Sequence, residues 1–453
     1  MTHNWMIRTQ IVKSILDNVT FLFLGAFVAQ TSEAADGSQV RIRGSAKDGY
    51  QLYVNEEHFV IRGVGGTSHI ELLASCGGNA IRTWDAASAE KKVDGKSLLD
   101  HAYDKNIFVT VGLWLGHERH GFRYDDPNSI TQQRDEVVNA IKRLKNHPAL
   151  LCWGLGNEME GPDGKGDSVQ IWKEVNTLAS LVKKHDPDHP VMTVVANVND
   201  AKLAAIKKYA PLIDILGVNV YSGSVGMDKT LRDLGWEKPY CVSEYGPPGP
   251  WEVASTTWKA PLEPSSRSKA STYFAATSSI LDATSKDGSQ VGQKYCLGGY
   301  AFLWGHKQET TATWFGMLLP TGEKTLVVDA MTKAWTGSWP RNRAPILQSN
   351  RITFAGKRVG PGEILDAHVE YRDPDSDDLS YIWEIVKEST DRKIGGDAEK
   401  RPDIIESRVI DGSGSDQIRI QAPQKTGGYR LFVTVRDGHG SGCSENWPFF
   451  VSP

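Results

Sequence analysis

The chain has 453 residues, of which 40% are hydrophobic and 23% are charged, and its formal net charge at pH 7 is −4. This composition is typical of a globular protein, and the charge balance offers no basic excess for nucleic acid, which we do not expect as a partner. There is a single strongly apolar stretch, so a polytopic membrane protein is excluded. The 14 Trp residues indicate a large aromatic core or platforms that stack on flat ligand faces such as sugar rings.

The first 34 residues have the pattern of a secretory signal peptide. Arg8 and Lys13 precede the apolar run VTFLFLGAFVA at 19–29, and Ser32-Glu-Ala34 has the small-x-small pattern of a cleavage site. The run is too short to span a bilayer comfortably. We therefore expect an exported protein, secreted, periplasmic or at the cell surface, without stable membrane insertion. An uncleaved N-terminal anchor is the alternative.

Residues 40–340 alternate short apolar runs with amphipathic stretches. The stretches 135–145 and 169–184 carry apolar residues three and four positions apart, which is typical of helices that bury one face. Repeated strand–helix units predict a (β/α)8 TIM barrel, in which the chemistry lies at the C-terminal ends of the strands. The apolar runs that we assign as its strands are Phe59–Val64, Asn79–Trp84, Phe108–Leu115, Leu150–Leu155, Val191–Ala196, Ile213–Tyr221, Tyr240–Glu244 and Gly299–Trp304.

A linker at Trp335–Pro345 separates this region from a different one at 341–453. Short alternating runs at 364–371, 380–385, 417–420 and 429–436 are separated by turns, which predicts an all-β Ig-like sandwich. We interpret it as a spacer packed on the barrel, with a sugar-binding module as the alternative. The acidic turn Asp373–Asp378 is expected to be solvated, and calcium binding is its alternative role.

Two predicted strands end in a carboxylate. The segment NHPALLCWGLGNE at 146–158 ends the fourth strand with Asn157 and Glu158, and PYCVSEYG at 239–246 places Glu244 at the end of the seventh. Two carboxylates that flank one sugar are what glycoside hydrolysis needs, because one protonates the leaving oxygen and the other attacks the anomeric carbon. The alternative is that both are solvated surface charges.

These motifs resemble the clan A retaining glycoside hydrolases, barrels typified by families 2 and 5, over about residues 50–330. The resemblance implies that Glu158 is the acid/base with a raised pKa, and that Glu244 is the ionised nucleophile. It also implies that Arg82, at the end of the second strand, steadies Glu244, and that Asn157 bonds the 2-hydroxyl of the sugar. Tyr221, at the end of the sixth strand, is expected to point at Glu244.

Further residues after strand ends are candidates for substrate contact. Trp304 ends the eighth strand and is expected to form the floor of the cleavage subsite. His117 follows the third strand, in a segment whose His and Glu residues lack the spacing of a zinc helix motif. No metal or organic cofactor is expected. The remaining candidates lie in the seventh and eighth loops and are Trp251, Trp258, Gln308 and Glu309.

We therefore expect a retaining β-glycoside hydrolase that cleaves an extracellular polysaccharide or oligosaccharide with two Glu residues. The compact Glu-Tyr-Gly segment, and a barrel followed by an Ig-like domain, are similar to β-1,3-glucan-active families, including the family 158 endo-β-1,3-glucanases, so β-1,3-glucan is the favoured substrate. The alternatives are a β-glucanosyltransferase, a β-mannan or β-galactoside hydrolase, and a non-catalytic carbohydrate-binding barrel. Glu158, Glu244 and Asn157 together argue against the last.

Overall fold

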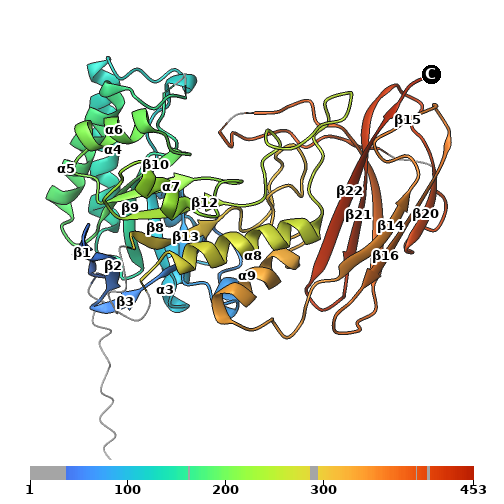
Figure 1. Ribbon diagram of the computed structural model, residues 1–453, viewed down its shortest axis with the longest axis horizontal. Coiled ribbons are helices and arrows are strands. Elements are labelled where there is room, and N and C mark those ends of the chain that lie inside the picture. Colours follow the sequence, from blue (N-terminus) through green and yellow to red (C-terminus); the bar gives the residue numbers. More distant parts are fainter. Residues whose placement is uncertain (1–36, 162–163, 286–293, 394, 406–408) are drawn as a thin grey trace, which may run out of the picture. The chain divides into compact units, whose positions relative to one another are not determined.

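The computed structural model describes residues 37–161, 164–285, 294–393, 395–405 and 409–453. The predicted signal peptide lies outside the described residues. Figure 1 shows the barrel, coloured from blue to orange, followed along the chain by the sandwich in orange and red. Among the described helices, none has the length and apolar character that a membrane span requires.

Eight parallel strands close into a barrel, which confirms the predicted fold class. Each predicted apolar run overlaps one barrel strand, and the last run begins three residues after the start of its strand. Residues of these strands are almost entirely buried, because the barrel interior covers one face and helices cover the other, and this explains why the runs are continuously apolar. The strands are β4 (Ile61–Gly65), β5 (Ala80–Arg82), β8 (Phe108–Leu113), β9 (Leu150–Leu155), β10 (Val191–Ala196), β11 (Ile215–Asn219), β12 (Tyr240–Tyr245) and β13 (Cys296–Ala301).

Helices connect successive strands. The longest begins at Pro127, where the Asp126 side chain accepts the backbone N–H groups of the first turn, and it buries Val137, Ile141 and Leu144 on one face. The helices are α1 (Ile70–Ser75), α2 (Ala86–Glu90), α3 (Leu98–Asp104), α4 (Pro127–Leu144), α5 (Val169–His185), α6 (Asp200–Tyr209), α7 (Met227–Asp233), α8 (Ser266–Asp282) and α9 (Leu326–Thr336). Since α9 extends to Thr336, the predicted linker begins too early.

Two small antiparallel sheets accompany the barrel. The first comprises β1 (Val40–Ser45), β2 (Gly49–Val54) and β3 (Glu57–Phe59), and the second pairs β6 (Lys92–Val93) with β7 (Lys96–Ser97). Val40, Leu52 and Val54 of the first sheet are buried in one cluster with Leu151 and Met192 of the barrel. This sheet therefore packs against the barrel strands.

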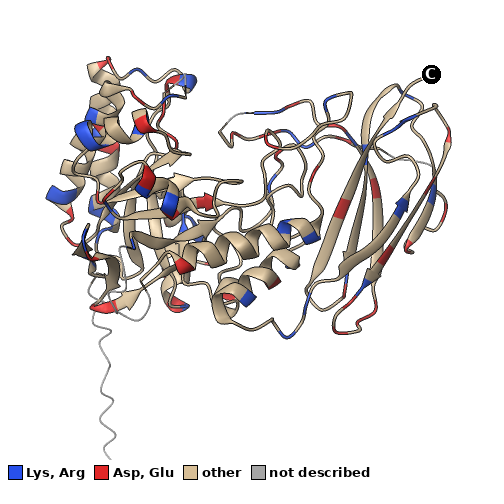
Figure 2. Cartoon of the chain, in the orientation of Figure 1, with Lys and Arg blue, Asp and Glu red and all other residues tan. Residues whose placement is uncertain are grey.

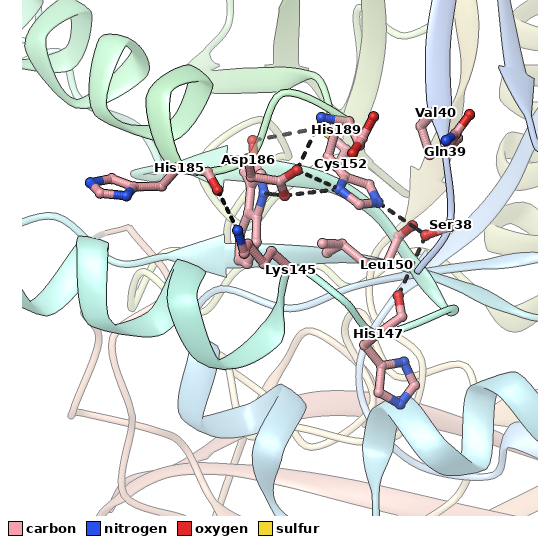
Figure 3. A network of polar contacts seen from close by, with 12 residues as sticks. Ser38, Gln39, Val40, Lys145, His147, Leu150, Cys152, His185, Asp186 and His189 are labelled. Carbon is pink, nitrogen blue, oxygen red and sulfur yellow. Dashed lines mark hydrogen bonds and ion pairs between the residues drawn. The ribbon is translucent and has the colours of Figure 1, made fainter. Parts of the chain in front are cut away.

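A buried polar network ties the start of the described chain to the N-terminal ends of β9 and β10. Figure 3 shows His189 between Asp186 and Ser38. His189 Nδ1 lies 2.8 Å from Asp186 Oδ2, and its Nε2 lies 3.0 Å from Ser38 Oγ. Ser38 donates to the carbonyl of Leu150 at 2.5 Å, and Trp153 Nε1 donates to Asp186 at 2.7 Å.

This Ser–His–Asp arrangement is a structural clamp. Its three side chains belong to residues that are 2%, 4% and 2% exposed, so no substrate reaches Ser38. The network also lies at the N-terminal end of the strands, whereas TIM barrel enzymes carry their sites at the other end. Burial by itself would raise the pKa of Asp186, but the hydrogen bonds from His189 and Trp153 outweigh it and lower that pKa.

The C-terminal region forms two packed antiparallel sheets, as predicted. Residues of β16 alternate between buried and exposed, so each sheet presents one apolar face to the other. One sheet has the order β14 (Ile346–Ile352), β16 (Ile364–Arg372), β20 (Gln417–Gln421) and β19 (Val409–Asp411). The other contains β15 (Arg358–Val359), β22 (Gly442–Val451), β21 (Gly427–Arg436), β17 (Ser380–Lys387) and β18 (Ile404–Ile405).

Replacement of Ser38 by Ala tests the clamp. The variant leaves a ring nitrogen of His189 and the carbonyl of Leu150 without their shared partner, which costs about 1–3 kcal/mol of unfolding free energy. Urea denaturation followed by Trp fluorescence measures this loss. Ser45→Ala is the matched control, because the Ser45 hydroxyl bonds only Asp48 at the surface. Equal midpoints for the two variants would contradict a structural role for the network.

Candidate active site

The two strand-end carboxylates line one cavity of about 840 Å³. Glu158 follows β9 by three residues, and Glu244 is the penultimate residue of β12. Because the C-terminal ends of all barrel strands meet at one rim, residues far apart in the sequence converge there. Asn157 and Tyr221 line the same cavity, and the buried Arg82 lies behind it.

Glu244 is held by three donors from two other barrel strands and their loops. Its Oε1 accepts hydrogen bonds at 2.9 Å from Arg82 Nη1 and from Trp84 Nε1. Its Oε2 accepts from the hydroxyl of Tyr221 at 3.1 Å. Burial, with the Glu244 charge adding to it, raises the pKa of Tyr221 well above its usual range, so this phenol stays a donor. An ionised carboxylate only accepts hydrogen bonds, and this set of donors suits it.

Two amides connect Glu244 to Glu158 through Arg82. Arg82 Nη2 donates to Asn157 Oδ1 at 2.7 Å, and Asn219 Nδ2 donates to the same oxygen at 3.1 Å. Asn219 Nδ2 also donates to Glu158 Oε1 at 3.0 Å, and its own Oδ1 accepts from Ser243 at 2.8 Å. The orientation of one carboxylate therefore depends on the same buried network as that of the other.

Backbone geometry presents Glu158 to the cavity. Gly156 and Glu158 have φ angles of 69° and 54°, in the left-handed region that costs a Glu residue about 1–3 kcal/mol. The Glu158 N–H donates to the carbonyl of Val194 at 3.0 Å. Behind it, the buried Glu160 pairs with Lys202 at 3.1 Å. This ion pair ties the loop to the end of β10, since Lys202 also donates to the Ala196 carbonyl at 2.6 Å.

The surroundings of Glu158 favour its protonated form. Burial raises its pKa to about 7, and the nearby negative charge of Glu244 adds to this effect. The N–H of Asn219 and the charge of Arg82 oppose it. Glu158 thus receives one side-chain donor where Glu244 receives three, so the surroundings of the two carboxyl groups are unequal.

Aromatic side chains cover much of the cavity wall. Trp251 is 64% exposed and Trp114 is 41% exposed, so both offer ring faces to a ligand. Tyr221 contacts Trp251 edge to face, with 5.8 Å between ring centroids. The remaining aromatic lining residues are Trp84 and Phe302. Such surfaces stack well on the apolar faces of sugar rings.

Of the predicted contact residues, Trp251 and Glu309 line the cavity and four others do not. Trp304, which we expected to form the floor of the cleavage subsite, is 2% exposed and donates to the Ser68 carbonyl. Phe302 lines the cavity instead. His117 is buried behind Trp114, and its burial, with the charges of Arg119 and His120, lowers its pKa to about 4. Trp258 packs on Phe450 of the sandwich, and Gln308 faces a second, smaller pocket.

Sequence reasoning missed Trp84, Asn219 and Trp114 as site residues. Trp84 stands two positions after Arg82 at a strand end, where alternate residues share a direction. Asn219 stands two positions before Tyr221 in the same way. The alternation of side-chain direction along a strand is the feature that could have identified Trp84 and Asn219. Trp84 shares the direction of Arg82, and Asn219 shares that of Tyr221.

The sandwich contributes directly to the cavity, which corrects its interpretation as a spacer. Arg392, Lys393, Asp397 and Glu399 of the segment between β17 and β18 are lining residues. In the sequence they are ordinary polar loop residues, so no local pattern identifies them as part of the site.

The acidic turn of the sandwich lies outside this cavity. Oxygens of Asp373, Asp377 and Asp437 lie within 4.8 Å of one another. Asp373 Oδ1 accepts the backbone N–H groups of Asp375 and Asp377 at 2.8 and 3.2 Å, which shapes the turn. These backbone contacts account for the shape of the turn.

Glu244→Gln should lower the pKa of Glu158 by about 1, because it removes a neighbouring negative charge. Titration of ¹³C-labelled Glu side chains by NMR measures this change. Glu445 is an internal control, since burial also raises its pKa to about 7 but it lies on β22. The Glu158 resonance should move in the variant, as should that of Glu309, whose pKa is raised by burial and by the Glu244 charge, whereas that of Glu445 should stay. A Glu158 midpoint that stays unchanged would contradict the electrostatic coupling.

Comparisons with known proteins agree with this geometry. The model of the glycosyl hydrolases family 2 TIM barrel domain matches residues 70–248. A β-glucuronidase of Paenibacillus borealis is 24% identical over 246 residues, which are 46% of this chain and 38% of that protein. A β-galactosidase of Pectobacterium atrosepticum is 33% identical over 67 residues, 15% of this chain and 6% of the other. The chain thus spans less than half the length of either curated relative.

Solved structures of similar fold include β-glucuronidases. That of Bacteroides uniformis has a TM-score of 0.48 and 14% identity, covering 91% of this chain and 48% of its own. That of Dictyoglomus thermophilum has a TM-score of 0.49 and 18% identity, covering 67% and 54%. The expected kinship with family 158 is corrected by these findings, because the matching model is that of family 2 and the curated relatives are named β-glucuronidase and β-galactosidase. Residues 70–248 are thus similar to the TIM barrel domain of the family 2 glycosyl hydrolases.

Proposed function

We propose that this protein is a retaining β-glycoside hydrolase with Glu158 as acid/base and Glu244 as nucleophile. The observation that carries the proposal is the unequal environment of two carboxyl groups in one cavity. Burial raises the pKa of Glu158 to about 7, whereas Glu244 accepts from Arg82, Trp84 and Tyr221. The match to the family 2 barrel domain supports the same assignment.

The reaction proceeds in two displacements. Glu158 donates its proton to the glycosidic oxygen as the bond from the anomeric carbon to that oxygen breaks, and a Glu244 oxygen bonds to the anomeric carbon. The departing group leaves as an alcohol. Glu158, now ionised, then takes a proton from water while the water oxygen attacks the anomeric carbon. The bond to Glu244 breaks, Glu158 is protonated again, and the product keeps its β configuration.

We propose a neutral β-hexoside, with β-galactosides first, as the substrate class. The β-1,3-glucan expectation has lost its basis, since the relatives are named β-glucuronidase and β-galactosidase. The charge of the cavity wall favours a neutral sugar over a glucuronide, whose sugar carries a carboxylate. Its three cations, Lys307, Arg392 and Lys393, already pair with Glu309, Glu388 and Asp391. Its acidic lining residues are more numerous and comprise Glu158, Glu244, Glu252, Glu309, Asp397 and Glu399.

A panel of 4-methylumbelliferyl β-D-glycosides tests the substrate class. We expect the galactoside to be hydrolysed with a kcat/KM at least about 10-fold above that of the glucuronide, because a carboxylate would enter a wall with an acidic excess. Glucoside and mannoside complete the panel. Preference for the glucuronide would overturn the electrostatic argument while leaving the mechanism intact.

Variants of the two Glu residues test the mechanism. Glu244→Ala should lower kcat by a factor on the order of 10⁴ or more, and Glu158→Ala should lower kcat/KM by about 10²–10⁴. In the wild type, kcat/KM should fall as the pH rises through about 7, because Glu158 must be protonated to act as the acid.

This alkaline limb should vanish in Glu158→Ala and persist in Glu445→Gln, which removes the other Glu with a pKa near 7. NMR of the first-formed product gives its anomeric configuration. An α product would exclude the double displacement, and activity that survives in Glu244→Ala would exclude Glu244 as nucleophile.

A further inference from the structure

The rim of the barrel is low over two neighbouring strands. Only residues 66–69 separate β4 from α1, and only residues 83–85 separate β5 from α2. The connection after β10 is also short, at residues 197–199, whereas others are long, as with residues 246–265 between β12 and α8 and residues 302–325 between β13 and α9. The barrel by itself therefore leaves the cavity without a tall wall above β4 and β5.

A segment of the sandwich occupies this gap. We call the connection between β17 and β18, with described residues 388–393 and 395–403, the sandwich loop. On one side Asp397 Oδ2 lies 3.0 Å from His120 Nε2, in the connection after β8. On the other side the Gly396 carbonyl accepts from Lys307 at 2.6 Å, and Glu399 Oε2 accepts from the Thr310 N–H at 2.6 Å, both in the connection after β13.

The order of strands shows what lies between these two anchors. Around the barrel the sequence is β13, β4, β5, β8, so a loop fixed to the connections after β13 and after β8 spans the rim above β4 and β5. Arg392, Asp397 and Glu399 line the cavity there.

Polar contacts between the sandwich and the barrel hold the sandwich loop at the cavity. Arg430, which is 2% exposed, pairs with Glu388 at the root of the sandwich loop and donates to the Pro261 carbonyl of the barrel at 2.6 Å. Arg392 donates to the Lys259 carbonyl at 3.0 Å. A second contact joins Asn446 Nδ2 to the buried Glu263 at 2.6 Å. Buried charges that lose such partners are costly, so these contacts hold the sandwich in one position.

The proposed mechanism indicates on which side of the reacting glycosidic bond the sandwich loop lies, and the inference rests on that mechanism. Glu158 must lie beside the glycosidic oxygen, so the leaving group extends past β9 toward the connections after β10 and β11, where Asn197 and Gly223 line the cavity. The sugar that bonds to Glu244 lies the other way, near Trp84 at the end of β5. The sandwich loop stands beyond that sugar.

We propose that the sandwich loop closes the non-reducing end of the cleft and so determines the length of glycone that the enzyme accepts. A sugar chain enters by its terminal residue, and a second residue on the non-reducing side would collide with Asp397 and Glu399. Figure 2 shows acidic and basic residues interspersed on both the barrel and the sandwich. The selection of glycone length that we propose is steric.

The test uses the 4-methylumbelliferyl β-glycoside of galactobiose, and mass spectrometry of its first products. The wild type should release galactose and leave the methylumbelliferyl galactoside, with galactobiose below about a tenth of the product. The double variant Asp397→Ala/Glu399→Ala removes the side-chain contact of the loop with His120 and that with Thr310, together with two lining side chains. It should raise the share of galactobiose at least fivefold, because the longer glycone then fits.

His120→Ala is the second variant, since it loosens Asp397 from the barrel side without altering a lining residue. It should shift the products in the same direction, to a smaller extent. Asp403→Ala is the matched control, because Asp403 pairs with Lys387 at the surface and lies outside the cavity, so its products should equal those of the wild type. Thermal midpoints confirm that each variant is folded.

Direct release of galactobiose by the wild type, or wild-type products from both loop variants, would overturn the inference. These results differ from a failure of the proposed function, which would appear as no release from any monosaccharide glycoside or as release that survives Glu244→Ala. Either of the latter results removes both proposals together.

Discussion

The buried guanidinium of Arg82 is the interaction on which the site depends. It donates to Glu244 from β12 and to Asn157 beyond β9, and a third bond reaches the Ser243 carbonyl. Arg82 is 2% exposed, so its charge has no access to water and must keep these partners. Removal of one partner of a buried ion pair costs about 3–5 kcal/mol. The positions of both carboxylates are therefore coupled to the packing of the barrel core.

The same network lets two residues of one type take different roles. Glu244 receives three side-chain donors, one of them cationic, which match an ionised carboxylate. Glu158 receives only Asn219 and feels the charge of Glu244, and its burial raises its pKa to about 7. In this way a difference in donor count and position gives the two carboxyl groups of one cavity unequal surroundings, as the proposed acid/base and nucleophile require.

The sandwich is an integral part of this arrangement. The barrel supplies the strand ends, but its short connections after β4 and β5 leave one side of the rim low. Buried polar contacts, from Arg430 to the Pro261 carbonyl and from Asn446 to Glu263, hold the sandwich against the connection between β12 and α8. The same docking brings Arg392, Asp397 and Glu399 into the cavity wall. One set of interactions thus serves both stability and the shape of the site.

Much of the fold was readable from the sequence because barrel strands are buried on both faces. That burial produces continuous apolar runs, and their ends all meet at one rim, so chain order alone placed Glu158, Glu244, Arg82 and Tyr221 together. The two-sheet sandwich was equally visible in its alternating runs and turns.

Other parts of the site depend on tertiary contacts that no local pattern encodes. A Trp at a strand end can face the cavity, as Trp84 does, or the core, as Trp304 does, because a shift of one residue or a change of backbone direction reverses the side. Asp397 and Glu399 look like any polar turn, and only the docking of one domain on another carries them to residues more than eighty positions away. The sequence by itself determined the barrel and its two carboxylates, since regular burial leaves a regular pattern. The tertiary structure decided which aromatic rings and which loop enclose them, because contacts between distant segments depend on how whole elements pack.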